Sequence, residues 1–443
     1  MRKLTIGALR RAYLAGDTTP SKLLSDLAAR FDDGDQKAVW ISTISPERLA
    51  ESCAALEADP RNKDLPLYGI PFSVKDNIDA AGFSTTAACP AFAYRPQHSA
   101  TVVARAEAAG AICMGKTNLD QFATGLVGMR SPYGVPRNPY NRDYIPGGSS
   151  SGAGVSVSTG MVAFAFGTDT GGSGRVPASY NGIYGWKPAP GEWSRQGLVY
   201  ACRSFDTATV FTADLASAQA VDAVVRGRDA DDPFSAEISR TEVNHPRVAM
   251  PLPDEIDTFG DADVAALYKE AHRWFLSETT VSEADLTPFQ SINDLMFFGP
   301  MLAERDVSVG AFIEANPDQC HPVVGPMIQA SRKFSASDAY RALYQVAEAK
   351  AKTETFWSCT DVLALPTVGA LVTRETCEAD PLGPNFQNGT YTNFANPMGL
   401  FGLAIPFDTS SAGVPWGITL YTKAEHSSAA IRLAGAIERN DIS

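Results

Sequence analysis

The sequence predicts an α/β fold built on a β-sheet flanked by helices. From Tyr68 onward, short apolar runs alternate with segments of helical periodicity, which is the pattern of strands connected by helices. The 443 residues are 44% hydrophobic and 20% charged, as in globular proteins with a large core. This length allows about three domains. Because the chain has no Pro/Ser-rich linker, low-complexity block or repeat, we expect a single domain over residues 1–443.

The expected elements follow from periodicity and capping residues. Helical periodicity over 5–31, with Thr19 placed to cap a helix that starts at Pro20, predicts a helical N-terminal preface over 1–65. Strands are expected at 69–74, 111–114, 361–365 and 418–421, and helices at 100–109, 263–277, around 295–305 and at 337–357. These later helices predict a mostly helical substrate-cap region at about 247–358. In its last helix, Ser337 is the expected cap, and the expected packed face is lined by Tyr340, Leu343, Tyr344 and Ala347.

Composition excludes several classes of protein. With 37 Lys and Arg against 50 Asp and Glu, the net charge of −13 argues against nucleic acid and anionic membranes as partners. Arg10 and Arg11 interrupt any signal-peptide core, and no apolar run is long enough to span a bilayer. Seven scattered cysteines without Cys-x-x-Cys spacing indicate reduced thiols in a soluble cytoplasmic protein. Five histidines without metal-ligand spacing predict no metal site.

The sharpest local feature is Gly-Thr-Asp-Thr-Gly-Gly-Ser-Gly-Arg at 167–175, which follows an apolar run and places Ser173 directly after two glycines. Glycines let the chain turn so that successive N–H groups converge near one hydroxyl. The sequence therefore predicts an oxyanion hole from the amides of Thr170, Gly171, Gly172 and Ser173. An isolated Gly-Gly-Ser would indicate a tight surface turn, but a second one at 147–149 favours a catalytic site.

A serine nucleophile needs a positioned base. None of the five histidines stands in a recognisable catalytic context, so a lysine is the alternative, because burial can lower its pKa from about 10.4 by several units. Lys75 directly follows the apolar strand expected at 69–74 and should emerge at its end. Without other support, a lysine in that position would be a solvated strand terminus.

Three segments in this order together resemble the amidase-signature family: Gly-Ile-Pro-Phe-Ser-Val-Lys-Asp-Asn at 69–77, Gly-Gly-Ser-Ser-Ser-Gly at 147–152 and Gly-Thr-Asp-Thr-Gly-Gly-Ser at 167–173. The resemblance covers almost the whole chain. It implies a central mixed sheet flanked by helices and a homodimer that needs no cofactor. It also implies that Ser173 is the nucleophile, that Lys75 is the general base, and that Ser149, after a cis Gly148–Ser149 bond, passes the proton between them.

Further segments resemble one branch of the family, the allophanate hydrolases: 85–94, 122–128, 130–134, 174–177, 201–204 and 389–396. This implies a small, linear, urea-like substrate whose terminal carbonyl is attacked by Ser173, releasing ammonia, and a product that later loses carbon dioxide. Gly-Pro-Met-Leu-Ala-Glu-Arg at 299–305 matches a branch motif whose arginine binds the substrate carboxylate. Arg305 is therefore the expected substrate-binding residue, and backbone groups around Gly125 are expected to complete the pocket. The resemblance gives Asp169 and Arg175 a structural role in the loop.

Two departures from this branch leave the substrate open. Phe297 stands where the branch has a tyrosine, and the sequence stops before the smaller C-terminal domain common in the branch. A related molecule such as guanylurea or biuret is therefore an alternative to allophanate. Three other interpretations also remain: the amidase subunit of a tRNA-dependent amidotransferase, an inactive amidase fold used as a scaffold, and an aryl or fatty amide hydrolase with a broad apolar pocket.

Overall fold

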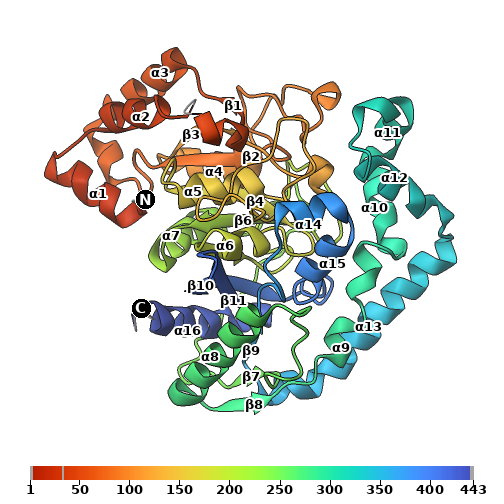
Figure 1. The fold of residues 1–443 in the computed structure, drawn as a ribbon. Helices are drawn as coiled ribbons and strands as arrows, with labels where there is room; N and C mark the ends of the chain where they lie inside the picture. The colour runs from red at the N-terminus through yellow and green to blue at the C-terminus, as the bar shows by residue number, and fades with distance from the viewer. Residues whose placement is uncertain (1–2, 32–33, 440–443) are drawn as a thin grey trace.

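Over residues 3–31 and 34–439, which the computed structural model describes, an 11-stranded mixed sheet forms the centre of the protein (Figure 1). The strand order is β1-β3-β2-β4-β6-β5-β10-β11-β9-β7-β8. The strands are β1 Trp40–Thr43, β2 Pro71–Lys75, β3 Ile112–Thr117, β4 Phe164–Asp169, β5 Tyr184–Lys187, β6 Thr207–Thr212, β7 Val248–Met250, β8 Val281–Glu283, β9 Val362–Pro366, β10 Phe401–Thr409 and β11 Pro415–Thr422.

The pairing of the strands is partly parallel and partly antiparallel. β2 runs parallel to β3 and β4, and β7 runs parallel to β8 and β9, whereas the remaining neighbours are antiparallel. Every residue of β2 and β4 is buried, as expected for central strands covered on both faces. The predicted α/β class, with a mixed sheet flanked by helices, is therefore confirmed.

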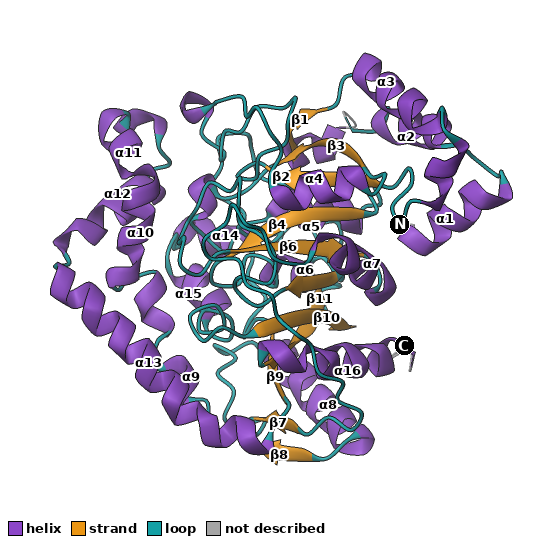
Figure 2. Ribbon diagram, turned by 180° about the vertical axis from the view of Figure 1, so that it is seen from behind, coloured by secondary structure: helices purple, strands orange, loops and turns teal. Residues whose placement is uncertain are grey.

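Helices surround this sheet (Figure 2). Both termini lie on the same side of the molecule, whereas the segment from α9 to α13 forms an outlying layer on the opposite side (Figures 1 and 2). The helices are α1 Ile6–Ala15, α2 Pro20–Ala28, α3 Pro46–Glu57, α4 Thr101–Ala108, α5 Ser151–Ser158, α6 Val176–Tyr180, α7 Leu215–Val225, α8 Ala262–Glu278, α9 Thr287–Gln290, α10 Ala303–Arg305, α11 Ala311–Ala315, α12 Val324–Gln329, α13 Ala336–Cys359, α14 Arg374–Ala379, α15 Gly383–Gly389 and α16 Ser427–Arg439.

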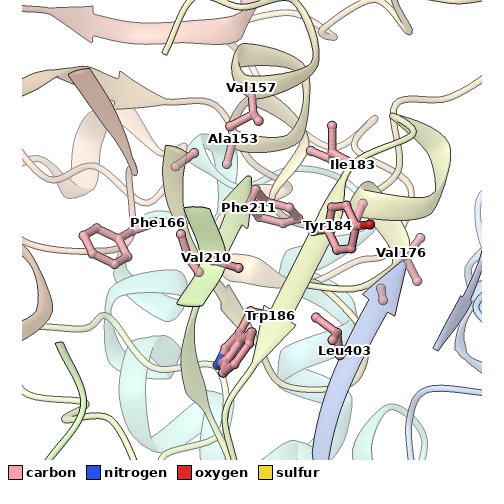
Figure 3. Packing of buried hydrophobic residues seen from close by; sticks show 14 of the residues in the cluster. Ala153, Val157, Phe166, Val176, Ile183, Tyr184, Trp186, Val210, Phe211 and Leu403 are labelled. Atoms are coloured by element: carbon pink, nitrogen blue, oxygen red, sulfur yellow. The ribbon is translucent and has the colours of Figure 1, made fainter. Parts of the chain in front are cut away.

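The core lies between these helices and the middle of the sheet (Figure 3). Val210 of β6 and Trp186 of β5 are fully buried there, and Ala153 of α5 packs in the same cluster. The Trp186 ring meets that of Phe401 edge to face, with centroids 5.1 Å apart. This packing keeps the ends of the strands and the starts of the helices rigid, and these carry the polar residues of the candidate site.

The expected N-terminal cap is present. Thr19 accepts a hydrogen bond from the Lys22 amide, and α2 begins at Pro20. Residues 1–65 carry α1, α2, β1 and α3, and the segment 247–358 carries β7 and β8 as well as helices. No helix of the described residues is long and apolar enough to cross a membrane.

The expected packed face of the last long helix is wrong. Tyr340 and Tyr344 of α13 are 60% and 61% exposed, whereas Ala342 and Val346 are buried. The N-cap is Ser335 rather than Ser337. The Ser335 hydroxyl accepts from the Asp338 amide, and the Asp338 carboxylate accepts from the Ser335 amide, which completes a capping box. The prediction followed the large apolar residues, whereas the neighbouring elements pack against the small ones. The preference of a tyrosine side chain for burial therefore did not decide which face of α13 is buried.

Candidate active site

Two parallel strands bring the candidate catalytic residues to one edge of the sheet. β2 ends at Lys75 and β4 ends at Asp169, and the two strands pair in parallel through Val74 and Phe166. Because parallel strands end at the same edge, Lys75 lies beside the loop that follows β4 and contains Ser173. The third candidate, Ser149, precedes α5, which packs on both strands.

Lys75, Ser149 and Ser173 form one continuous hydrogen-bonded chain. Lys75 Nζ donates to Ser149 Oγ at 2.7 Å, and Ser149 Oγ donates to Ser173 Oγ at 2.9 Å. Lys75 Nζ also donates to Thr168 Oγ1 at 2.8 Å. The Gly148–Ser149 peptide bond is cis. A neutral lysine would accept along the same chain, so the arrangement can carry a proton from Ser173 to Lys75 through Ser149.

Burial prepares Lys75 for this exchange. Its side chain has no solvent exposure, and burial lowers its pKa to about 7, against the opposing charges of Asp120, Asp206 and Asp169. A lysine with this pKa is neutral in a large fraction of molecules near neutral pH. It can therefore act as a base at the pH of a cell.

The loop after β4 takes its shape from a buried ion pair between Asp169 and Arg175. The two side chains have no exposure, and Arg175 Nη2 lies 2.8 Å from Asp169 Oδ1. Asp169 also accepts from the amides of Gly172 and Gly174 at 2.9 Å each. Although burial would raise the pKa of Asp169, the charge and hydrogen bonds of Arg175 lower it, so the carboxylate is ionised.

The expected oxyanion donors are in the turn that this ion pair holds. The Gly172 amide donates to Asp169 Oδ1. Among hydrogen bonds to described residues, the amides of Thr170, Gly171 and Ser173 make none. A Cβ on Gly172, whose φ is +136°, would lie 2.4 Å from Thr392 Oγ1, so glycine is required there.

Asp120 organises the loop that contains Gly125. A Cβ on Gly125 would lie 2.6 Å from Asp120 Oδ2, and that oxygen accepts from the Gly128 amide at 2.9 Å. The Asp120 amide donates to the carbonyl of Ser149 at 3.1 Å. The Gly125 loop is therefore attached directly to the segment that contains the bridging serine.

From the outlying helical layer, Phe297 reaches the loop that contains Ser173, and Arg305 packs on the Phe297 ring. The edge of the Phe297 ring lies 2.9 Å from where a Cβ of Gly171 would stand, and the guanidinium carbon of Arg305 lies 5.0 Å from the ring centroid. Arg305 is 1% exposed, and its Nη1 donates to the carbonyl of Met296 at 3.0 Å. Burial lowers the pKa of Arg305.

Three polar atoms around Phe297 and Gly171 are buried without a hydrogen-bond partner in the described part of the chain. Arg305 contributes two donors, Nε and Nη2, and Asn393 contributes an acceptor, Oδ1. Asn393 Oδ1 lies 2.7 Å from the Cβ position of Gly171. Leaving such atoms unpaired costs about 1–3 kcal/mol each. This combination suits a ligand that carries both an anionic group and an N–H group.

Asp206 connects the nucleophile loop, which is the segment 170–175 after β4, to the segment 201–204. Its carboxylate accepts from the hydroxyl of Thr170 and from the amides of Ala201 and Cys202. Glu304, the neighbour of Arg305, accepts from the Ser204 amide at 2.9 Å. Burial raises the pKa of Asp206 to about 6, against the hydrogen bond from Thr170.

Sequence reasoning missed Thr168, Asp120, Asp206 and Asn393. Thr168 lies within the 167–175 motif, so its position beside Lys75 was detectable. Asn393 lies within the branch-like segment 389–396, but that segment did not indicate that its side chain meets Gly171. Asp120 and Asp206 lie outside the motifs, and the fold brings them to the site. In the portion that the structure describes, no group of three His, Cys, Asp or Glu side chains could hold a metal ion.

Comparison with known proteins assigns this arrangement to a family. A family model described as Amidase matches residues 22–429. The urea amidolyase of Saccharomyces cerevisiae is 38% identical over 411 residues, which cover 90% of this chain and 22% of that protein. The chain therefore spans less than a quarter of that relative's length. A glutamyl-tRNA(Gln) amidotransferase subunit of Treponema pallidum is 31% identical, over 97% of this chain and 93% of that protein.

A solved structure gives the same result. An allophanate hydrolase of Kluyveromyces lactis superposes with a TM-score of 0.91 at 35% identity, covering 96% of this chain and 71% of that one. The central sheet and its flanking helices are thus those of that protein's fold.

Proposed function

The chain belongs to the amidase-signature family, as its motifs predict, and from this premise we propose that it is a serine amidohydrolase acting on small, linear, urea-like amides. The observation that carries the proposal is the buried hydrogen-bonded chain from Lys75 through Ser149 to Ser173. A hydroxyl becomes a competent nucleophile only when a base is within reach, and these distances meet that condition.

The proposed reaction has two halves. Neutral Lys75 takes the Ser173 proton through Ser149 while Ser173 Oγ bonds to the amide carbon. The amides of Thr170, Gly171 and Ser173 stabilise the oxyanion, each donor being worth about 2.7–4 kcal/mol in known cases. The C–N bond then breaks, and the proton returns to the nitrogen, which leaves as ammonia. Water hydrolyses the acyl-enzyme by the same proton path in reverse.

The unpaired atoms around Phe297 and Gly171 support a ureido carboxylate of the allophanate type. Arg305 offers Nε and Nη2 to a carboxylate, and Asn393 Oδ1 offers an acceptor to an N–H group. A planar guanidinium suits bidentate recognition of a carboxylate. The N-carboxylated product would later lose carbon dioxide. The names of the yeast relatives, urea amidolyase and allophanate hydrolase, agree with this substrate class.

Ammonia release by the purified protein tests the proposal. The substrate panel is allophanate, biuret, guanylurea, malonamate and an aryl amide, with Ser173→Ala as the matched control. Allophanate is expected to be the best substrate. Guanylurea or biuret as the best substrate would mean that Arg305 does not select an anion. Turnover that persists in Ser173→Ala would refute the mechanism.

An amidotransferase component is a second candidate, favoured by the near full-length match to the Treponema pallidum protein. This candidate predicts glutamine as the preferred ammonia donor and a requirement for partner subunits. Including glutamine in the panel separates the two functions, because a self-sufficient hydrolase of ureido compounds releases ammonia without partners.

The expected single domain, homodimer and cytoplasmic location form part of the same proposal. Light scattering coupled to size exclusion tests the homodimer. A monomer with full activity would remove the oligomer from the proposal and leave the chemistry unchanged.

A further inference from the structure

An apolar cavity of about 550 Å³ lies behind the phenylalanine that closes the site on one side. It lies between the outlying helical layer and the segment that leads into α15. Its wall includes Phe297, Phe298, Leu302, Met327, Phe334 and Leu382. Cavities of this size and composition hold apolar groups of small molecules.

Phe297 separates this cavity from the nucleophile loop. The residue lines the cavity, and its ring edge also stands 2.9 Å from the Cβ position of Gly171, two residues before Ser173. One face of the ring is covered by the Arg305 guanidinium at 5.0 Å. Phe297 is 3% exposed, so its side chain is closely packed between the cavity and the nucleophile loop.

The cavity wall is also linked to the Gly125 loop through Arg130. Pro381 lines the cavity, and its carbonyl accepts from Arg130 Nη2 at 2.7 Å. Arg130 Nη1 donates to the carbonyl of Thr124 at 3.0 Å, directly before Gly125. The cavity wall is thus bonded to the Gly125 loop, and the Phe297 ring lies between the cavity and Gly171.

We propose that Phe297 sets the size limit of the substrate by closing the Ser173 site against the apolar cavity. The inference rests on the proposed function, since it assigns a specificity to the same site. Primary amides with an aryl or branched alkyl substituent are excluded because the ring occupies the space that the substituent needs. The chemistry is unchanged in the opened site: Ser173 forms the ester, ammonia leaves, and water hydrolyses the ester.

The test replaces Phe297 and uses its neighbour as the matched control. Phe298 lines the same cavity and stacks on Phe386 with ring centroids 3.8 Å apart, whereas the ring atoms nearest the Gly171 Cβ position belong to Phe297. Ammonia release from phenylacetamide and from acetamide is measured in Phe297→Ala and Phe298→Ala. We expect Phe297→Ala to raise the ratio of kcat/KM for phenylacetamide to that for acetamide by roughly tenfold or more, and Phe298→Ala to leave it within about threefold.

Labelling of Ser173 separates this inference from the proposed function. Small and arylalkyl fluorophosphonates react with an activated serine whatever its natural substrate, and mass spectrometry gives the rates. Faster labelling by the arylalkyl reagent in Phe297→Ala supports the size limit even if none of the amides is turned over. An unchanged preference in a variant that still labels would overturn it, as would an equal gain in Phe298→Ala. If Phe297→Ala does not fold, the smaller change Phe297→Leu must show a gain over the wild type that Phe298→Leu does not show.

Discussion

Lys75 Nζ and Ser149 Oγ lie 2.7 Å apart in a region without solvent exposure. Such a contact is expensive for a charged lysine, because burial disfavours the ammonium form. The same burial makes the amine available as a base, so the contact serves chemistry at a cost in stability. The expected pH dependence follows from this relationship.

Activity is expected to fall in acid as Lys75 becomes protonated. The pKa of Lys75 is lowered to about 7, and the competent form is the neutral amine. Activity is therefore present above about pH 7, and kcat/KM declines about tenfold per pH unit below it. A pH–rate profile between about pH 5 and 9 measures this limb. A profile that stays flat through the neutral range would argue against Lys75 as the base.

Replacement of Arg305 is expected to discriminate between charged and neutral amides. Loss of hydrogen bonds to a charged group costs about 1.5–3 kcal/mol, which corresponds to roughly 10- to 150-fold in kcat/KM. Arg305→Met should show this loss with malonamate but much less with a neutral amide of similar length. Arg305→Lys keeps the charge without the planar guanidinium, so its kcat/KM for malonamate should lie between those of the wild type and Arg305→Met. An equal loss for both substrates would indicate a structural role.

Asp206 is expected to act on the transition state through Thr170. Its carboxylate accepts from the Thr170 hydroxyl and so fixes the start of the oxyanion turn. Asp206→Asn should lower kcat by about tenfold or more and change KM by less than about threefold, because oxyanion donors contribute mainly in the transition state. Thr170→Val breaks the same bond from the other side and should reproduce the split. A change in KM alone would contradict this role.

The Asp169–Arg175 pair is expected to dominate the stability of the nucleophile loop. Removing one partner of a buried ion pair leaves the other charge uncompensated, at a cost of about 3–5 kcal/mol. Asp169→Asn should therefore lower the free energy of unfolding by this amount. Glu242→Gln is the control, since the Glu242–Arg432 pair is exposed and should contribute at most about 1 kcal/mol. Denaturant unfolding of the two variants gives the comparison.

Several parts of the fold were accessible from local patterns. The strand at β2 and the cap at Thr19 depend on neighbouring residues, so sequence periodicity and capping rules predicted them. The face of α13 was not accessible in this way. Its tyrosines are the larger apolar residues, but burial was decided by which side of the helix packs against α9 and the segment 300–302.

By itself, the sequence determined the α/β class and the types of residue available for chemistry, because glycine turns, strand ends and motifs are properties of short stretches. Only the tertiary structure decided which of these residues meet. Asp206 bonds Thr170 across 36 positions, and Phe297 approaches Gly171 from a separate helical layer. These contacts depend on the pairing of β4 with β6 and on the packing of that layer against the sheet, which result from interactions over the whole chain and leave no local pattern.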